Sequence, residues 1–289
     1  TECFPGQFRN WFYSLLAMSA ELEGVAPFKT LLGHALVKDE KGKEMHKSTG
    51  NAIWFDEAAE KMGVDVMRWM YASQNVEHHL LFGYSAADEV RKKIITLWNV
   101  YSFYATYANL DEFSPGNFTL KTKNMTILDK WILAKTNKLI EIAKISFDNY
   151  KISEFMKIFE FYLDDLSNWY IRRNRRRFWK SDNDEDKNTA YMTLFKVLCD
   201  VIKILSPVIP FITEKIYQNL VRNSVENSPE SVHHCDFPVP NDQWNEDELI
   251  KKVDSMKNLI ELGRSARNES GIKVRQPLST LYYALEDSK

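Results

Sequence analysis

The sequence is poor in cysteine, glycine and proline, and it has no strong excess of charge of either sign. It contains three cysteines, 10 glycines and 9 prolines in 289 residues, and its formal net charge is -2. Three cysteines far apart in the sequence argue against a disulfide framework and favour a reducing compartment, so we expect a cytoplasmic protein. A charge near zero gives the whole chain no general attraction to polyanions, so any nucleic-acid surface must be local.

Long apolar runs are also missing. No stretch approaches the ~18 apolar residues of a membrane span, and the first residues, TECFPGQF, lack the charged and apolar regions of a signal peptide. We therefore expect no membrane partner. Hydrophobic residues still make up 44% of the chain, enough for a folded core in one large or two ordinary domains. The first residue is Thr1 rather than methionine, which favours a processed protein or a piece of a longer one.

Glycine and proline cluster in the first fifty residues, between short apolar runs, as is typical of an α/β layer. Helical periodicity follows, beginning with a short helix that Asp65 is expected to cap, and four longer segments have the apolar faces of a helix bundle. Residues 223–245 are expected to form a connector, residues 247–269 a last helix, and the segment from Ile272 a strand. The predicted fold is mainly α, with a helix bundle preceded by an α/β piece.

The segment from Asn168 to Trp179, NWYIRRNRRRFW, contains five arginines and no acidic residue. Cations bind phosphates and planar aromatic rings stack on bases, so this combination predicts a nucleic-acid surface, most simply one that holds tRNA. The candidate contact residues are Trp169, Arg172, Arg175, Arg176, Phe178 and Trp179.

Helical phase divides these arginines into two groups. At 100° per residue, an apolar stripe that ends at Tyr170 extends through Arg173 and Arg177, so these two are expected to point inward into a structural network. Arg172, Arg175 and Arg176 lie off the stripe and are the candidates for RNA contact. The alternative is that the cluster is a solvated charged face, neutralised by the acidic residues that follow it: Asp182, Asp184, Glu185 and Asp186.

A second candidate site is the loop from Gly42 to Asn51, GKEMHKSTGN. Its lysine, serine and glycine residues could present Lys47 and backbone N–H groups to a phosphate. The loop is not a P-loop, because the sequence contains no GxxxxGK[ST] pattern. Taken without its neighbours, the loop is better explained as an ordinary turn.

Several segments together resemble the class I aminoacyl-tRNA synthetases, and their isoleucine-specific branch in particular. EMHKSTGN resembles the KMSKS loop, which is normally followed by GN, and NWYIRRNRRRFW resembles the SNWYIRR.RRRFW run of the isoleucine branch. LSPVIPFITEKIY resembles the bundle helix that follows, QFRNWFYSLL the QxRGWF stretch beside the amino-acid pocket, and GIKVRQPL the junction after the bundle. The resemblance covers nearly the whole chain. It implies ATP-dependent activation of isoleucine and its transfer to tRNA.

The resemblance also implies roles for individual residues. Lys47 matches the second lysine of KMSKS, which contacts the ATP phosphates and stabilises charge during adenylate formation, so it is the candidate catalytic residue. Gln7 and Trp11 match residues on the adenylate side of QxRGWF. The implied ATP contacts are Met45, His46, Lys47, Ser48, Gly50 and Asn51.

The sequence departs from the family pattern at several of these positions. Glu44 replaces the first lysine of KMSKS, and His46 replaces the first serine, although Lys43 could supply the missing charge. Gly6 and Asn10 replace the aspartate and glycine that are common beside the amino-acid pocket. The amino-acid contacts are therefore less secure than the phosphate contact.

The HIGH motif of the family is absent, so we expect a C-terminal fragment that binds tRNA but cannot form an adenylate alone. The expected division is the end of the catalytic domain in residues 1–86, the anticodon-binding bundle in 87–245 and the start of a junction region in 246–289. ATP would enter as its magnesium complex, and the protein would be a monomer. We expect no metal site at the sequence HHC of residues 233–235, although zinc could bind elsewhere in a full-length protein.

Three alternatives remain open. A valine- or leucine-specific synthetase would share the loop and the bundle but less of the arginine run. A non-catalytic tRNA-binding module would explain Glu44 and His46 as signs of a decayed loop. A helical interaction protein would use every arginine structurally and would have negligible affinity for tRNA.

Overall fold

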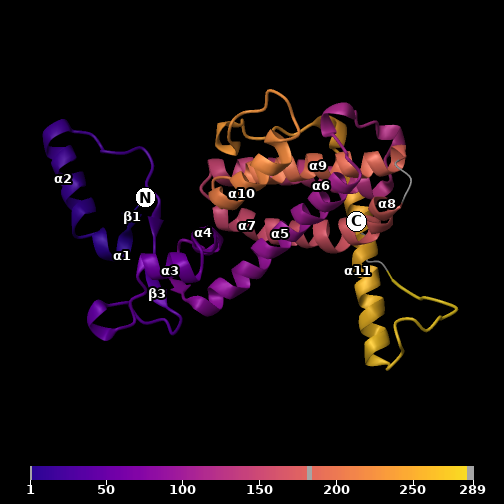
Figure 1. Ribbon diagram of the computed structural model, residues 1–289. Helices are drawn as coiled ribbons and strands as arrows, with labels where there is room; N and C mark the ends of the chain where they lie inside the picture. Colours follow the sequence, from indigo (N-terminus) through magenta and orange to yellow (C-terminus); the bar gives the residue numbers. More distant parts are fainter. Residues whose placement is uncertain (1, 181–183, 285–289) are drawn as a thin grey trace.

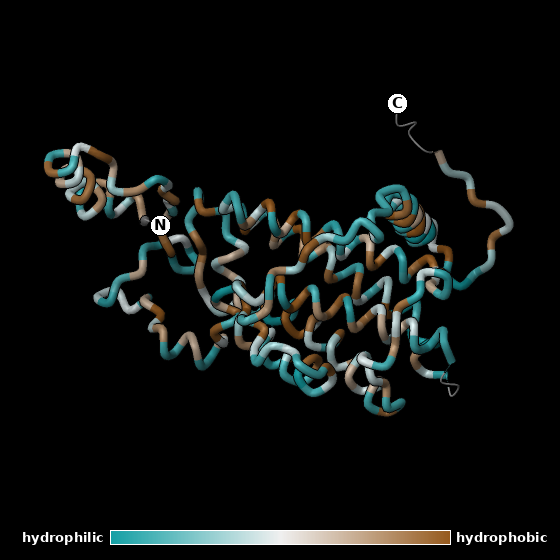
Figure 2. Tube along the Cα trace, turned by 90° about the horizontal axis from the view of Figure 1, so that it is seen from above, coloured by the Kyte–Doolittle hydropathy of each residue, from teal (hydrophilic) through white to brown (hydrophobic). Residues whose placement is uncertain are grey.

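A small N-terminal lobe leads into a larger bundle of helices in the computed structural model, which describes residues 2–180 and 184–284 (Figure 1). The lobe contains β1 (Glu2–Cys3), α1 (Phe4–Gln7), α2 (Trp11–Glu23), β2 (Gly33–His34), β3 (Val37–Asp39), α3 (Phe55–Lys61), α4 (Val64–Ser73) and β4 (Leu80–Phe82). The bundle contains α5 (Tyr84–Leu110), α6 (Ile127–Asp148), α7 (Ile152–Asp164), α8 (Arg172–Trp179), α9 (Glu185–Leu205), α10 (Pro210–Tyr217) and α11 (Asp247–Glu269). Figure 2 shows the lobe at one end of the molecule and the last described residues, after α11, at the other.

The lobe is held by two pairs of short parallel strands. β1 pairs with β2, and β3 pairs with β4, where Val37 lies opposite Leu80. Leu80 and Phe82 are buried while Leu81 between them is exposed, because successive side chains of a strand point to opposite faces. The prediction of a mainly helical fold with an α/β piece is confirmed.

The prediction of a strand after the last helix is wrong. Residues 272–284 form turns and extended backbone, and no strand is assigned within them. A strand needs a partner for its backbone N–H and C=O groups, and this segment is almost entirely exposed to solvent. Its β-branched and aromatic residues alone do not supply that partner.

The bundle helices form where the apolar periodicity predicts them. Thr126 begins α6 with a capping box, in which its hydroxyl accepts from the N–H of Asp129 at 3.2 Å while the Asp129 carboxylate accepts from the N–H of Thr126 at 2.8 Å. Pro210 occupies the first turn of α10, where its missing N–H leaves no helical hydrogen bond unmade. The fully buried aromatic rings of the bundle include Trp131, Phe155, Phe159, Tyr170, Tyr191 and Tyr217.

A π-helical segment interrupts the continuous helix from Ile152 to Trp179. This segment, η4 (Asp165–Ile171), joins α7 to α8. Its i to i+5 hydrogen bonds widen the turn, so each residue advances by less than 100° and the apolar stripe shifts in phase. Within α8 the buried positions are Asn174 and Phe178. Arg173 is therefore exposed, and its expected inward orientation is wrong.

Arg177 does point inward, as predicted, and joins three helices. Its Nη1 donates to Asp129 of α6 at 2.8 Å, and its Nε donates to Asp186 of α9 at 2.9 Å. The hydroxyl of Tyr170 donates to the same Asp129 carboxylate at 2.8 Å, and burial raises the pKa of Tyr170. The Asp129 side chain is inaccessible to solvent, while that of Arg177 is 12% exposed. These four side chains, Arg177, Asp129, Asp186 and Tyr170, form the Arg177 network.

A second polar junction connects the lobe with the bundle. The carboxylate of Asp65 in α4 accepts from the backbone N–H of Ile212, at 2.7 Å, at the start of α10. Arg68, one turn later, donates to the backbone carbonyls of Pro207 and Val208 at 2.6 and 2.9 Å. Asp65 thus caps α10 rather than its own helix α4, which begins after Gly63. The expectation that Asp65 caps α4 is therefore wrong.

We expect Asp129→Ala to lower the free energy of unfolding by about 3–5 kcal/mol, because it leaves the buried guanidinium of Arg177 without its deepest partner. Asp148→Ala, on the same helix, removes an exposed i,i+4 partner of Lys144 and should change it by at most about 0.5 kcal/mol. Urea unfolding of both variants measures the difference. Equal effects of the two substitutions would contradict the structural role of the Arg177 network.

Candidate nucleic-acid interface and nucleotide loop

The exposed face of α8 is strongly basic. Four of its five arginines are exposed: Arg172, Arg173, Arg175 and Arg176. Over residues 2–180 and 184–284, the arginine ion pairs are those of Arg91 and Arg177. The four exposed guanidiniums therefore crowd two turns of helix without a described carboxylate to neutralise them, an arrangement that favours binding of an anion.

The acidic residues after α8 have other partners. Asp186 pairs with Arg177 and with Lys180, the latter at 2.9 Å. These two cations hold the pKa of Asp186 below its usual range, although burial opposes the shift. Asp184 caps α9 and also pairs with Lys180, while Glu185 lies 3.7 Å from Lys121. Asp182 lies outside the described residues. The described part of this loop thus leaves the outer arginines free for another partner.

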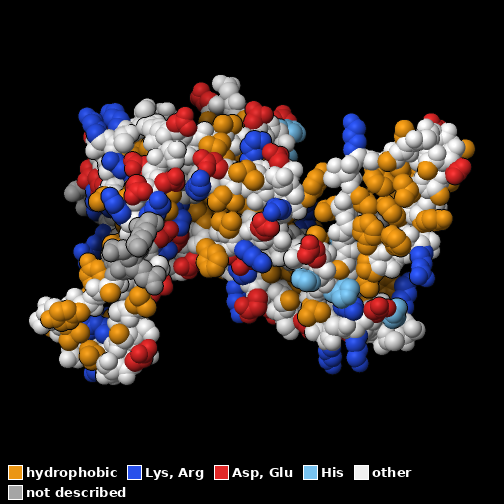
Figure 3. Space-filling view, turned by 180° about the vertical axis from the view of Figure 1, so that it is seen from behind, with side chains coloured by type: hydrophobic (Ala, Val, Ile, Leu, Met, Phe, Trp, Pro, Cys, Tyr) orange, Lys and Arg blue, Asp and Glu red, His pale blue; other side chains and the backbone are white. Residues whose placement is uncertain are grey.

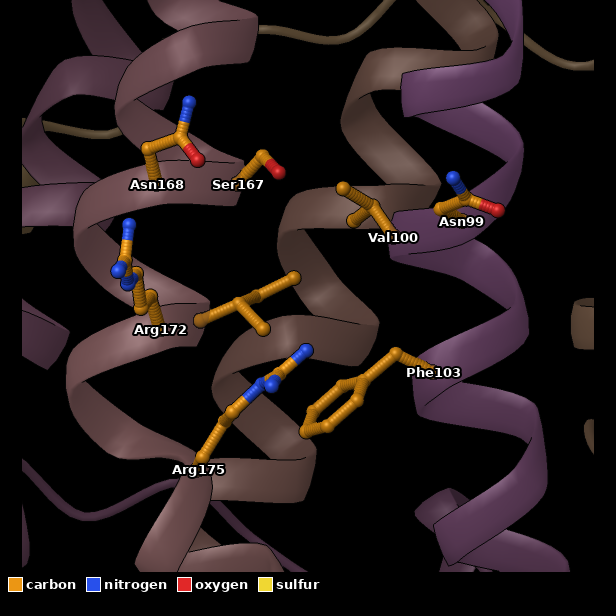
Figure 4. A pocket seen from close by; sticks show the side chains of 8 residues that line it. Asn99, Val100, Phe103, Ser167, Asn168, Arg172 and Arg175 are labelled. Carbon is orange, nitrogen blue, oxygen red and sulfur yellow. The ribbon is translucent and has the colours of Figure 1, made fainter.

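A pocket of about 350 Å³ opens between α8 and α5. Figure 4 shows Arg172 and Arg175 on one side of this pocket and Phe103 on the facing helix. The guanidinium of Arg175 lies 5.9 Å from the ring of Phe103 and 5.6 Å from that of Trp179, which is 53% exposed. The pocket is lined by Asn99, Val100, Phe103, Ser167, Asn168, Ile171, Arg172 and Arg175.

This pocket combines the groups that RNA binding needs. Guanidiniums bind phosphates, side-chain amides and hydroxyls can bond to base edges, and Trp179 offers an exposed ring for stacking. We did not predict Asn99 and Phe103 from the sequence. These two residues are four positions apart, so they lie on one face of α5, next to its apolar stripe. An amide and an aromatic residue at this spacing outside the stripe are the sequence signal that could have identified them.

Two of the predicted contact residues are not available to RNA. Phe178 is 1% exposed and packs at 5.1 Å against the rings of both Phe103 and Tyr191. Trp169 is 8% exposed, and Arg173 covers its ring at 4.8 Å. The expectation that these two rings stack on bases is wrong, because both rings are buried in the bundle.

The loop between β3 and α3 is held in shape by Asp39 and Asn51. Asn51 Nδ2 donates to the Asp39 carboxylate at 2.9 Å and to the Glu44 carbonyl at 3.0 Å. Its Oδ1 accepts from the backbone N–H of His46 at 3.0 Å. Asp39 also accepts from the backbone N–H of Lys43. The hydrogen bond from Asn51, and after it the one from Lys43, hold the pKa of Asp39 below its usual range.

Within this frame, Lys47 and Ser48 are exposed, and Met45 packs against the core. Lys47 begins a short 3₁₀ turn, Lys47–Thr49, that ends at Gly50. Gly50 has a φ of 71°, in the left-handed region where glycine is favoured. The Lys47 ammonium lies 4.6 Å from the ring of Trp54.

The two departures from the KMSKS pattern face one another. His46 Nε2 lies 3.4 Å from the Glu44 carboxylate, and both side chains are more than half exposed. Because both side chains are exposed, this pair contributes little to stability, and neither residue supplies the lysine charge that KMSKS has at the first of these positions. Lys47 and Lys43 therefore remain the cations that an ATP phosphate could meet in this segment.

The predicted amino-acid contacts lie on an apolar surface of the lobe. Gln7 ends α1 and is half-buried, and Trp11 begins α2 and is 58% exposed. No residue of α2 is buried, and Figure 3 shows hydrophobic side chains gathered on the surface of the lobe. The exposed hydrophobic residues there include Phe8, Trp11, Tyr13, Leu16, Met18 and Leu22. An apolar surface of this size is typical of an interface with another domain.

The described residues contain neither of two other kinds of feature. Among the described residues, no group of three or more histidine, cysteine or acidic side chains could hold a metal ion. None of the described helices combines the length and the apolar character that crossing a membrane requires.

Comparisons with known proteins agree with the arrangement of lobe and bundle. Residues 129–282 match the family model of the anticodon-binding domain of tRNA ligase, and residues 5–81 match that of the class I tRNA synthetases (I, L, M and V). The chain is similar to a solved ternary complex of Agrobacterium radiobacter K84 agnB2 LeuRS with tRNA and LeuAMS. The TM-score is 0.60 at 13% identity, over 81% of this chain and 27% of that one, so this similarity concerns the fold.

Curated relatives match over almost the whole chain. This chain is 40% identical to the isoleucine–tRNA ligase of Clostridium tetani over 98% of its own length, and 42% identical to that of Clostridium novyi over 96%. It spans 28% of the length of each of these relatives. The chain therefore belongs to the class I tRNA synthetase family, carries the family's anticodon-binding domain, and matches isoleucine–tRNA ligases as its relatives.

Proposed function

We propose that the chain is the tRNA-binding part of an isoleucine–tRNA ligase and that it also supplies Lys47 to the ATP site. The observation that carries the proposal is the basic face of α8: exposed arginines without described carboxylate partners border a pocket with polar side chains and aromatic rings. This face lies within the segment that matches an anticodon-binding domain. The proposed contacts are Arg172, Arg175, Arg176 and Trp179, with Arg173 added because it is exposed.

The nucleotide loop supports the second half of the proposal. In adenylate formation, negative charge builds on the ATP phosphates, and a cation fixed beside them stabilises it. Lys47 is exposed on a loop whose shape is set by Asp39 and Asn51 rather than by Lys47 itself. Its ammonium is therefore free to turn from Trp54 toward a phosphate, while Ser48 and the backbone around Gly50 would bind alongside it. Asn51 acts by holding the loop, since its side-chain amide is already engaged.

The rest of the reaction requires a longer protein. The chain spans 28% of the length of its relatives. We propose that it supplies half of the ATP site. We propose that residues 1–86 end the catalytic domain, 87–245 form the anticodon-binding bundle and 246–289 begin the next region. Gln7 and Trp11 would then face the aminoacyl adenylate across the apolar surface of the lobe. Magnesium would arrive with ATP, and the ligase would act as a cytoplasmic monomer.

Replacing Arg172, Arg175 and Arg176 together by glutamine should weaken binding of an isoleucine-acceptor tRNA on the order of 100-fold, because three phosphate contacts are lost. The log–log salt slope should become shallower by about 0.7–0.9 per contact. Lys92→Gln, Lys144→Gln and Lys251→Gln, combined, remove the same charge from exposed local pairs elsewhere. If this control weakens binding as much as the arginine variant, α8 is not the interface.

In the full-length protein, Lys47→Ala should lower the rate of isoleucine-dependent ATP–pyrophosphate exchange by about 10²–10³-fold, since one charge-stabilising donor is removed. Affinity for tRNA should stay unchanged. Lys41→Ala, an exposed lysine just before the loop, is the matched control and should leave exchange unaltered. Normal exchange in Lys47→Ala would instead favour a tRNA-binding module whose loop has no catalytic part.

The 289-residue chain alone should bind tRNA and show no ATP–pyrophosphate exchange with isoleucine, because the remainder of the ATP site is not in it. Exchange by the isolated chain would overturn this assignment. Charging of tRNA by the full-length protein with isoleucine, valine or leucine then identifies the amino acid, and preference for valine or leucine would transfer the proposal to a neighbouring branch of the family.

A further inference from the structure

α11 is fastened to the bundle by a buried charge network at the π-helical segment. Lys257 of α11 pairs with Asp165 of η4, which also binds Lys135 of α6 at 2.6 Å. The side chain of Asp165 is 4% exposed and that of Lys257 is 16% exposed. Asp254, one turn before Lys257, lies 3.5 Å from Lys135 and closes the network. Removal of a buried partner is costly, so this network fixes α11 against the bundle.

A second pocket of about 350 Å³ lies between α11 and the helix from η4 to α8. Its walls contain three arginines and a single carboxylate, Glu261. Arg172 belongs to both pockets, so the second pocket continues the first around α8. The lining residues are Asn168, Trp169, Arg172, Arg173, Glu261 and Arg264.

The guanidiniums of this pocket are positioned but not neutralised. The guanidinium of Arg173 lies over the ring of Trp169, and the Lys257 ammonium lies 5.5 Å from the same ring. Trp169 therefore positions Arg173 and does not itself stack on a base. Within the described ranges, Arg172, Arg173 and Arg264 form no ion pair, and Glu261 pairs with none of them. Arg267, the next arginine of α11, instead donates to the carbonyls of Lys273 and Gln276.

We infer that this second pocket binds a phosphodiester of the RNA backbone and that Arg264 makes α11 a second wall of the tRNA interface. Three guanidiniums from two helices converge there, and guanidinium is the side-chain group best matched to phosphate. Asn168 can add a side-chain contact to the sugar–phosphate backbone. The inference rests on the proposed tRNA binding by α8 and extends it to a helix that contains no part of the arginine run.

The test is tRNA binding by Arg264→Gln across a range of salt concentrations. We expect affinity to fall about 3- to 10-fold and the log–log salt slope to become shallower by about 0.7–0.9, as for one lost phosphate contact. Lys252→Gln is the matched control, since it removes one charge from an exposed position of α11 outside the pocket. Glu261→Gln should have the opposite effect and strengthen binding, because it removes the only carboxylate lining the pocket.

Circular dichroism and urea unfolding of each variant establish that the helices remain intact, as expected for exposed side chains. If Arg264→Gln behaves like Lys252→Gln while the triple α8 variant loses affinity, the pocket is not an RNA contact and the proposed function stands. If the triple α8 variant also keeps full affinity, the proposed function fails as well. Weaker rather than stronger binding by Glu261→Gln would likewise overturn the assignment of this pocket to phosphate.

Discussion

The contact between Arg177 and Asp129 is the constraint on which the basic face of the bundle depends. A buried ion pair contributes little net stability compared with well-packed apolar side chains, since both groups lose water. What it fixes is orientation: Asp129 belongs to α6, Arg177 to α8 and Asp186 to α9, so α8 cannot rotate without breaking the pair. With Arg177 held inward, the remaining arginines of α8 are turned to solvent, where an anion can reach them.

Much of this arrangement could be predicted from local sequence signals. Apolar periodicity located the bundle helices, and the inward direction of Arg177 followed from helical phase. The π-helical segment could not be predicted, because its widened hydrogen bonding is not visible in a 3.6-residue period. For that reason, Arg173 was expected on the wrong face, although Arg172 and Arg175 were placed correctly.

The nucleotide loop illustrates a different limit. The resemblance to KMSKS identified the residues from Met45 to Asn51, but not which of them shape the loop. The structure assigns that work to the amide of Asn51 and the carboxylate of Asp39, twelve residues earlier in the chain. Such a pairing depends on the path of the backbone in three dimensions. Asn51 and Asp39 therefore hold the loop in shape, while the exposed Lys47 remains available for the proposed chemistry.

The junction between lobe and bundle tolerates change on one side only. Arg68 binds backbone carbonyls of the turn between α9 and α10, and Asp65 binds a backbone N–H in the first turn of α10. Backbone groups are present whatever side chains the turn carries, so its sequence can drift while the joint stays intact, provided that the turn keeps its path. The two α4 residues have no such freedom, because the joint is built from their own side chains. Mutations that accumulate at this boundary should therefore be distributed asymmetrically between its two halves.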